Sequence, residues 1–139
     1  MRKVESKEAT VCILRLGKGN NVVSWNEELK SVIGSLYGAT ANFLQTNKRF
    51  IQPIPREEDY LPPNEDGALA ITASLVTKLR EGAFEGRRRA VAQQKADEQK
   101  IWSIMWAKMS PASQSKVEEV DGYEAALLDR DCVKLWEFI

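Results

Sequence analysis

The chain has 139 residues, with 20 Lys and Arg against 20 Asp and Glu, so its formal net charge is zero. Hydrophobic residues make up 43% of the chain, a balance typical of one globular domain with a buried core. It contains no histidine, which excludes Ser-His-Asp and Cys-His catalysis and any zinc site that needs histidine. It also lacks the overall basic excess of most nucleic-acid-binding domains.

Cys12 and Cys132 are the only cysteines in the sequence, and two such distant thiols do not make a disulfide framework, so we expect the reducing environment of the cytoplasm. No apolar run approaches the roughly 18 residues of a membrane span, and the N-terminus lacks the apolar segment of a secretory signal. No P-loop or dinucleotide fingerprint is present. We therefore predict a protein that is not an enzyme, holds no cofactor or metal, and has no membrane partner.

The chain begins with one candidate strand. Residues 10–16, TVCILRL, form a short apolar run with β-branched residues, which favours a strand. The GKGNN sequence at 17–21 predicts a turn, in which Asn20 or Asn21 is available to cap the helix that follows.

Two helices are predicted after this turn. A helix over residues 22–37 is indicated by apolar residues at helical spacing, and Gly38 is placed to end it. Those apolar residues are Val22, Trp25, Leu29, Val32, Ile33 and Leu36. Residues 39–47 predict a short second helix, with Phe43 and Leu44 facing the core.

The stretch at 51–64, IQPIPREEDYLPPN, holds four of the five prolines. Because proline lacks a backbone donor and restricts the residue before it, we expect no regular helix here. We interpret 51–64 as an extended, proline-rich connection between two helical blocks. Such a segment could also offer a docking peptide to a partner protein.

Helical spacing resumes after Gly67, with Leu69, Ile71, Thr72, Leu75, Val76 and Leu79 forming an amphipathic block. Gly82 and Gly86 each weaken a helix by about 1 kcal/mol relative to alanine, so one long helix and two helices meeting near 82–87 both remain open. A helix is predicted from about Arg88 to Met109. Its inward face holds Ile101, Trp102, Met105 and Met109, with Ile104 and Trp106 beside them.

The C-terminal part predicts three short helices. Ser110 is a candidate N-cap and Pro111 suits the first helical position. Val117 and Val120 are expected to point inward, and Gly122 to end that helix. Residues 123–128 predict a further turn of helix, and Asp131 is expected to cap a last helix carrying Val133, Leu135, Trp136 and Ile139.

We thus predict a mainly all-α domain over residues 1–139, with five to seven helices in a compact bundle and a short N-terminal strand. The residues expected to anchor its core are Trp25, Leu29, Trp102, Met105, Leu135 and Trp136. Trp106 lies off the inward stripe, so it either packs across two helices or marks a subunit contact.

Two separated patterns resemble one known family. The first is a leucine, a turn with glycine and asparagine, and a tryptophan that opens a helix, here LGKGNNVVSW at 16–25. The second is a helix ending in Ser110-Pro111, a short helix, the Ala125-Ala126 spacer and the Leu135-Trp136 pair. Together they resemble the Gag capsid region of copia-type LTR retrotransposons and their domesticated relatives, over residues 12–37 and 84–139. The proline-rich middle has no counterpart, and Phe84 stands where the family often has tryptophan.

The resemblance implies a structural self-assembly protein, the N-terminal capsid domain of a longer Gag-like protein, whose partner in a virus-like shell is itself. It fits the absence of a helix stop signal after Trp136, although docking of that end on a partner would explain it too. Related capsid domains use their early helices for ring contacts, which suggests a self-association face with Asn26, Lys30 and Ser35. The zinc knuckle of many Gag proteins is absent, so RNA packaging would lie elsewhere in a full-length protein.

Two alternative functions remain open at this point. Arg87, Arg88 and Arg89 could contact RNA or another polyanion, or they could be a solvated helix face partly offset by Glu81 and Glu85. A helical protein-interaction adaptor is the second alternative.

The remaining candidate reactive residues do not indicate catalysis. The acidic runs at 57–59 and 118–119 show no sign of the burial that acid-base catalysis needs. We expect Cys12 to be a small buried hydrophobic residue. The helix dipole would lower the pKa of the Cys132 thiol, but the neighbouring Asp131 opposes this effect, so we expect Cys132 to be unreactive.

Overall fold

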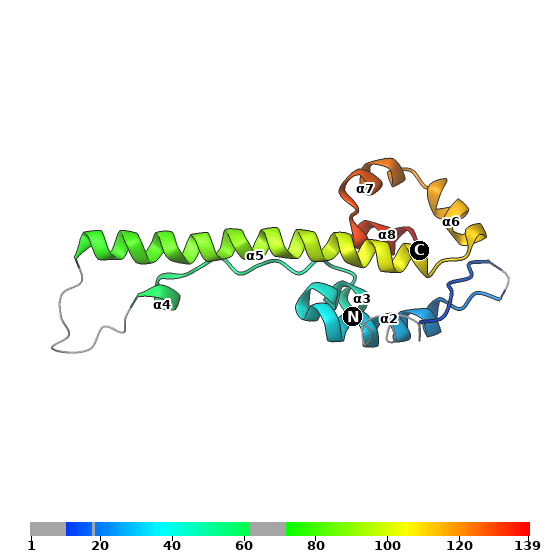
Figure 1. The fold of residues 1–139 in the computed structure, drawn as a ribbon, viewed down its shortest axis with the longest axis horizontal. Helices are drawn as coiled ribbons and strands as arrows, with labels where there is room; N and C mark the ends of the chain where they lie inside the picture. The colour runs from blue at the N-terminus through cyan, green and yellow to red at the C-terminus, as the bar shows by residue number, and fades with distance from the viewer. Residues whose placement is uncertain (1–10, 18, 62–71) are drawn as a thin grey trace. The chain divides into compact units, whose positions relative to one another are not determined.

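The computed structural model describes residues 11–17, 19–61 and 72–139, and over these residues the predicted mainly all-α fold is confirmed (Figure 1). The chain divides into two compact units, where we expected a single domain. The first unit comprises Met1–Phe50 and Lys95–Ile139, and the second comprises Ile51–Gln94. One boundary falls where the proline-rich stretch begins, and the other falls inside helix α5 (Ala73–Ala107).

In the first unit, the predicted helix over 22–37 is confirmed as α2 (Val22–Tyr37). The Asn20 side chain accepts a hydrogen bond from the backbone N–H of Val22, whereas Asn21 makes no side-chain cap. Gly38 ends α2 with a φ of 56°, a value that favours glycine. The 3₁₀ helix η1 (Gly38–Asn42) and α3 (Phe43–Thr46) follow, and α3 buries Phe43 and Leu44 as predicted.

The predicted strand over 10–16 is reduced to a single bridge between Leu14 and Met109 in the part of the chain that the structure describes. Leu14 N–H donates to the Lys108 carbonyl (2.7 Å), and Ser110 N–H donates to the Leu14 carbonyl (2.9 Å). Met109 lies in the short break between α5 and α6 (Pro111–Glu118), which leaves little backbone free of helix on that side. Within the described residues the pairing therefore does not extend into a longer ladder.

Helix α5 is continuous, so the glycines at 82 and 86 do not divide it into two helices. Neither Gly82 nor Gly86 has a positive φ, so the backbone continues through both as ordinary helix. In the first unit α5 buries the predicted inward residues Ile101, Trp102 and Met105, and Met109 is buried just beyond the helix. Gly82 and Gly86 thus cost helix stability without ending the helix.

The Ser-Pro turn forms as predicted. The Ser110 hydroxyl accepts from the backbone N–H of Ser113, and Pro111 begins α6. Val117 is buried, but the prediction that Val120 points inward is wrong, because its side chain is 36% exposed. Gly122 does not end α6. It lies in the turn before α7 (Tyr123–Asp129) with a φ of 94°.

The last helix, α8 (Cys132–Phe138), is capped as predicted by Asp131, whose carboxylate accepts from the backbone N–H groups of Val133 and Lys134. Of its predicted inward residues, Val133 and Leu135 are buried, whereas Trp136 and Ile139 are half-buried. The cap fixes where α8 begins and so sets which of its residues face the core.

Two aromatic pairs join these elements. Trp25 of α2 stacks on Trp136 of α8, with ring centroids 6.4 Å apart. Trp102 and Trp106 of α5 stack at 6.0 Å, and both contact Tyr123 of α7. Trp106 thus packs across two helices. The expected core anchors Trp25, Leu29, Trp102, Met105 and Leu135 are buried, and Trp136 is half-buried.

In the second unit, the described part of the proline-rich stretch is not entirely irregular. Residues 51–56 are extended, but α4 (Glu57–Tyr60) forms one turn of helix where no helix was expected. Residues 57–60 lie between prolines without containing one, and the Asp59 carboxylate accepts from Arg56 N–H at the start of the turn. The extended segment contacts α5 through a Gln52–Gln94 side-chain hydrogen bond of 2.8 Å.

The amphipathic block predicted after Gly67 is described only from Thr72 onward, and α5 begins at Ala73. Leu69 and Ile71 lie outside the described residues. Of the remaining apolar members, Val76 and Leu79 are half-buried, and Leu75 is 44% exposed. The inward stripe of this block is therefore narrower than predicted.

We predict that Ser113→Ala lowers the free energy of unfolding by about 1–3 kcal/mol. The Ser113 hydroxyl is buried, accepts from Leu16 N–H (2.9 Å) and donates to the Leu14 carbonyl (3.1 Å), so its removal leaves a backbone donor without its partner. Urea unfolding followed by tryptophan fluorescence measures the change. Ser115→Ala, at an exposed position of the same helix, is the control. Equal midpoints for the two variants would contradict the prediction.

Candidate functional site

The predicted self-association face does not form one exposed surface of α2. Asn26 is half-buried, and its side-chain amide donates to the Leu44 carbonyl on α3 (3.4 Å). Lys30 is half-buried and pairs with Glu27 at 3.1 Å. Ser35 is exposed, and its hydroxyl donates to the Val32 carbonyl. Asn26 therefore holds α3 against α2, and the exposed side of α2 presents other residues, among them Val23 at 79%.

The three arginines at 87–89 do not share one environment. Arg87 is half-buried within the second unit and donates to the Gln52 carbonyl (3.5 Å). Arg88 and Arg89 are exposed and both pair with Glu85, at 2.5 and 3.6 Å. The hydrogen bond and charge of Arg88 hold the pKa of Glu85 below its usual range. Two of the three arginines are thus partly neutralised, which weakens the predicted polyanion site.

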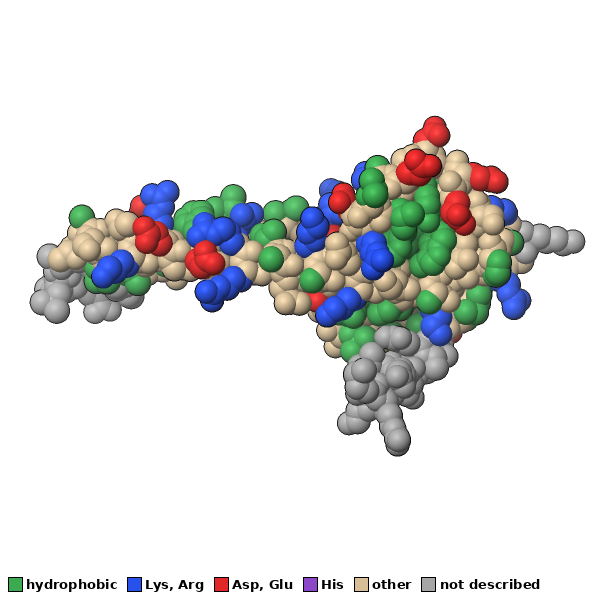
Figure 2. Space-filling view, turned by 45° about the horizontal axis from the view of Figure 1, so that its top comes forward, with side chains coloured by type: hydrophobic (Ala, Val, Ile, Leu, Met, Phe, Trp, Pro, Cys, Tyr) green, Lys and Arg blue, Asp and Glu red, His purple; other side chains and the backbone are tan. Residues whose placement is uncertain are grey.

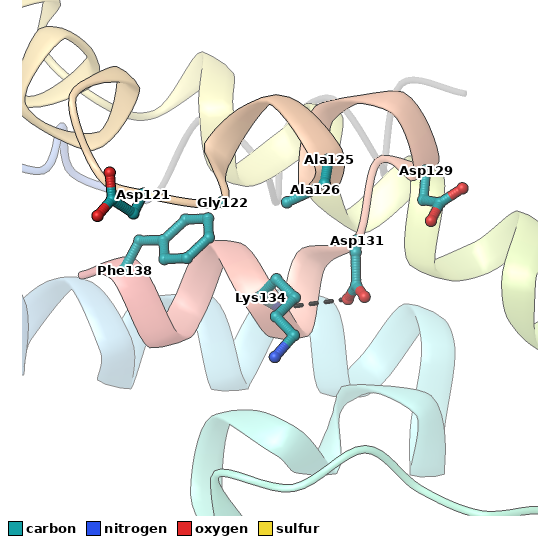
Figure 3. A pocket seen from close by; sticks show the side chains of 8 residues that line it. All are labelled: Asp121, Gly122, Ala125, Ala126, Asp129, Asp131, Lys134 and Phe138. Atoms are coloured by element: carbon teal, nitrogen blue, oxygen red, sulfur yellow. Dashed lines mark hydrogen bonds between the residues drawn. The ribbon is translucent and has the colours of Figure 1, made fainter.

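A pocket of about 320 Å³ lies between α7 and α8 (Figure 3). It is lined by Asp121, Gly122, Ala125, Ala126, Asp129, Asp131, Lys134 and Phe138. Figure 3 shows Asp121 and Asp129 at opposite ends of the pocket, with Phe138 and Lys134 between them. The carboxylates do not converge as an acid-base pair would, and Asp131 already caps α8. The pocket offers an apolar floor with acidic ends.

Arg49 makes an ion-pair network that the sequence gave no reason to expect. Its guanidinium pairs with Glu98 of α5 at 3.1 Å and with Asp131 at the start of α8. Burial alone lowers the pKa of Arg49, but the hydrogen bonds and charges of Asp131 and Glu98 outweigh burial and raise it. Glu98 is only 8% exposed, so this ion pair is largely buried on its acidic side. The network fixes α8, and with it one wall of the pocket.

The two cysteines differ in environment. Cys12 is half-buried rather than buried as expected, and its backbone N–H donates to the Glu28 carboxylate at 2.6 Å. Burial and the hydrogen bond with Glu28 raise the pKa of the Cys12 thiol. Cys132 is buried, and burial together with Glu98 and Asp131 raises its pKa strongly. Both thiols are therefore protonated at neutral pH and poorly nucleophilic.

The end of α6, the following turn and α7 form a surface that sequence reasoning missed, which we call the acidic surface (residues 117–129). It carries five Asp or Glu and no Lys or Arg, and all five acids are exposed. Exposed apolar side chains lie among them: Leu128 at 87%, Leu127 at 43% and Val120 at 36%. Figure 2 shows acidic side chains around hydrophobic ones on this part of the molecule. The sequence signal for this surface was the AALL run at 125–128. One short helix cannot bury four consecutive residues, so some of these apolar side chains must be exposed.

Within the described ranges, no group of three or more His, Cys, Asp or Glu side chains could hold a metal ion. The acidic runs at 57–59 and 118–119 are exposed. None of the helices in that part of the chain combines the length and apolar character needed to cross a bilayer.

Comparison of the chain with protein-family models, with curated proteins and with solved structures gives no match.

We predict that Glu28→Gln flattens the acid dependence of stability. The hydrogen bonds from Cys12 hold the pKa of Glu28 below its ordinary value of 4.5. A lowered folded-state pKa means that the stabilisation is complete above 4.5 and is lost as the pH falls through the folded-state pKa. Denaturant unfolding across this range should show the wild type and Glu28→Gln converging at acid pH. Glu27→Gln, at an exposed position of the same helix, is the control.

We predict that a thiol reagent at neutral pH modifies Cys132 only when the chain unfolds, because the thiol is buried and protonated. The Cys12→Ser variant isolates Cys132 for the measurement. Its labelling rate should rise with urea along the unfolding curve. Rapid labelling of this variant without denaturant, while its fluorescence remains native, would contradict the burial of Cys132.

Proposed function

We propose that this chain is a structural self-assembly protein of the cytoplasm, a Gag-like capsid N-terminal domain that makes repeated contacts with copies of itself in a virus-like shell. The main support is that the two sequence patterns that resemble copia-type Gag meet in one core. Sequence similarity in two distant stretches is more meaningful when the stretches depend on each other structurally.

The contacts between the two patterns are specific. Leu16 N–H donates to the Ser113 hydroxyl, 97 positions away. The indole N–H of Trp25 donates to the Lys108 carbonyl at 3.1 Å, just before the Ser-Pro turn. The ring of Trp25 stacks on Trp136 of the leucine-tryptophan pair. Leu16 and Trp25 of the first pattern thus each contact the second pattern, as expected if the two patterns form one architectural unit.

Exposed apolar side chains also support assembly. Leu128 and Val23 expose about four-fifths of their surface, and both lie on helices of the first unit. Exposed apolar groups next to charged ones are common at protein–protein contacts. A shell needs each contact to be weak alone: a Kd near 0.1 mM corresponds to roughly −5.5 kcal/mol. Several such contacts per copy reinforce one another once a ring closes.

The mass of the protein as a function of its concentration tests the proposal. Light scattering from micromolar to millimolar protein should show the mean mass rising in steps above 15.7 kDa toward rings or shells, which electron microscopy can then image. A constant monomer mass over the whole range, at low and at high salt, would contradict self-assembly by this chain. A one-to-one complex with a different protein and no self-association would favour the adaptor function.

RNA binding through Arg87, Arg88 and Arg89 stays a prediction of the alternative function. Binding by phosphate contacts weakens steeply as salt rises. Titration of a single-stranded RNA at two salt concentrations, with Arg88→Glu as the variant, distinguishes it from self-assembly, because shell formation without RNA does not require this contact.

A further inference from the structure

Charge is separated along this chain although the net charge is zero. The acidic surface at 117–129 carries five acids and no base. Between residues 75 and 91, in the second unit, α5 carries five Lys or Arg against two Glu, and we call this part the basic stretch. Both regions are largely exposed (Figure 2). One chain therefore presents two exposed regions of opposite sign.

Both regions also expose apolar side chains. On the basic stretch Leu75 is 44% and Val91 is 43% exposed, and the side chains of Arg88 and Arg89 are 67% and 82% exposed. On the acidic surface Leu127 and Leu128 are exposed. Apolar side chains with charges at their rim form the usual composition of a protein contact, in which the charges select the partner and the register.

We propose that the acidic surface of one copy binds the basic stretch of α5 in a second copy, head to tail. The inference rests on the proposed self-assembly and names the two surfaces that carry it. A second copy is the occupant because the complementary charge lies on this same chain. Since the two surfaces differ, the contact is heterologous: every copy keeps one free surface of each kind, and the chain of contacts extends or closes into a ring.

The pocket between α7 and α8 gives this contact a point of insertion. It opens on the acidic surface, and its volume of about 320 Å³ admits an arginine side chain. The aliphatic stem of an arginine would pack on Ala125, Ala126 and Phe138, and its guanidinium would reach Asp121 or Asp129 (Figure 3). Arg88 and Arg89 are the exposed arginines that such an insertion could use.

Two charge-reversed proteins test the contact. The acidic-surface variant carries Glu118→Lys and Glu124→Lys, and the basic-stretch variant carries Arg88→Glu and Arg89→Glu. All four positions are exposed, and circular dichroism at rising temperature confirms that each variant folds like the wild type. Each variant alone should associate at least roughly tenfold more weakly than the wild type in light scattering, because like charges now oppose each other.

Mixing the two variants gives the decisive result. Each variant retains the surface that the other has lost, and the two reversed surfaces are also opposite in sign, so an equimolar mixture should regain assembly beyond the dimer. Growth beyond a dimer is expected of a head-to-tail contact, because every copy in the mixture then has two surfaces that can pair. If the contact instead joined two acidic surfaces or two basic stretches, the mixture would stop at one-to-one dimers, and the proposal would be wrong.

Matched controls reverse the same charges elsewhere on the first unit. Glu27→Lys with Glu137→Lys, and Lys30→Glu with Lys48→Glu, should associate like the wild type. Loss of association in these controls would place the contact on the surfaces that carry the control residues and overturn the proposal. A wild type that assembles, with both surface variants unaffected, refutes the named surfaces and leaves self-assembly intact. A wild type that stays monomeric refutes self-assembly itself, and the named contact with it.

Discussion

The hydroxyl of Ser113 holds together two parts of the first unit that lie 97 positions apart in the sequence. It accepts from Leu16 N–H and donates to the Leu14 carbonyl, while Ser110 N–H donates to the same carbonyl. These bonds satisfy buried backbone groups that no regular sheet satisfies there. With the N-terminal segment fixed against the Ser-Pro turn, α2 is placed so that Trp25 reaches Lys108 and stacks on Trp136.

The ion pairs of Arg49 attach the start of α8 to α5 within the first unit. Arg49 follows α3 and pairs with both Glu98 and Asp131, which are distant from it in the sequence. Because Asp131 also caps α8, one carboxylate both starts that helix and attaches it to the rest of the unit. The remaining exposed side of α7 then carries the leucines and acids of the acidic surface. The same interactions that stabilise the fold therefore decide which surface is left for a partner.

Local sequence rules predicted most helices correctly, because their signals act over a few residues. Asn20 and Gly38 bound α2, Ser110 and Pro111 start α6, and Asp131 caps α8. Gly122 was misassigned because a positive-φ glycine serves equally after one helix and before the next. The prediction of a strand at 10–16 was wrong for another reason. An apolar β-branched run shows a preference for extended backbone, but a strand needs a partner, and among the described residues only Met109 pairs with this segment.

The sequence by itself determined the helical class, the caps that start α6 and α8, the buried faces around Trp25 and Trp102, and the absence of histidine chemistry. Each of these follows from residue type and short-range spacing. Only the tertiary structure decided that Asn26 packs against α3, that Arg87 is half-buried whereas Arg88 and Arg89 are exposed, and that Leu127 and Leu128 remain exposed. These outcomes depend on which elements pack together, and hydrogen bonds between residues 97 positions apart leave no periodic signal in a single sequence.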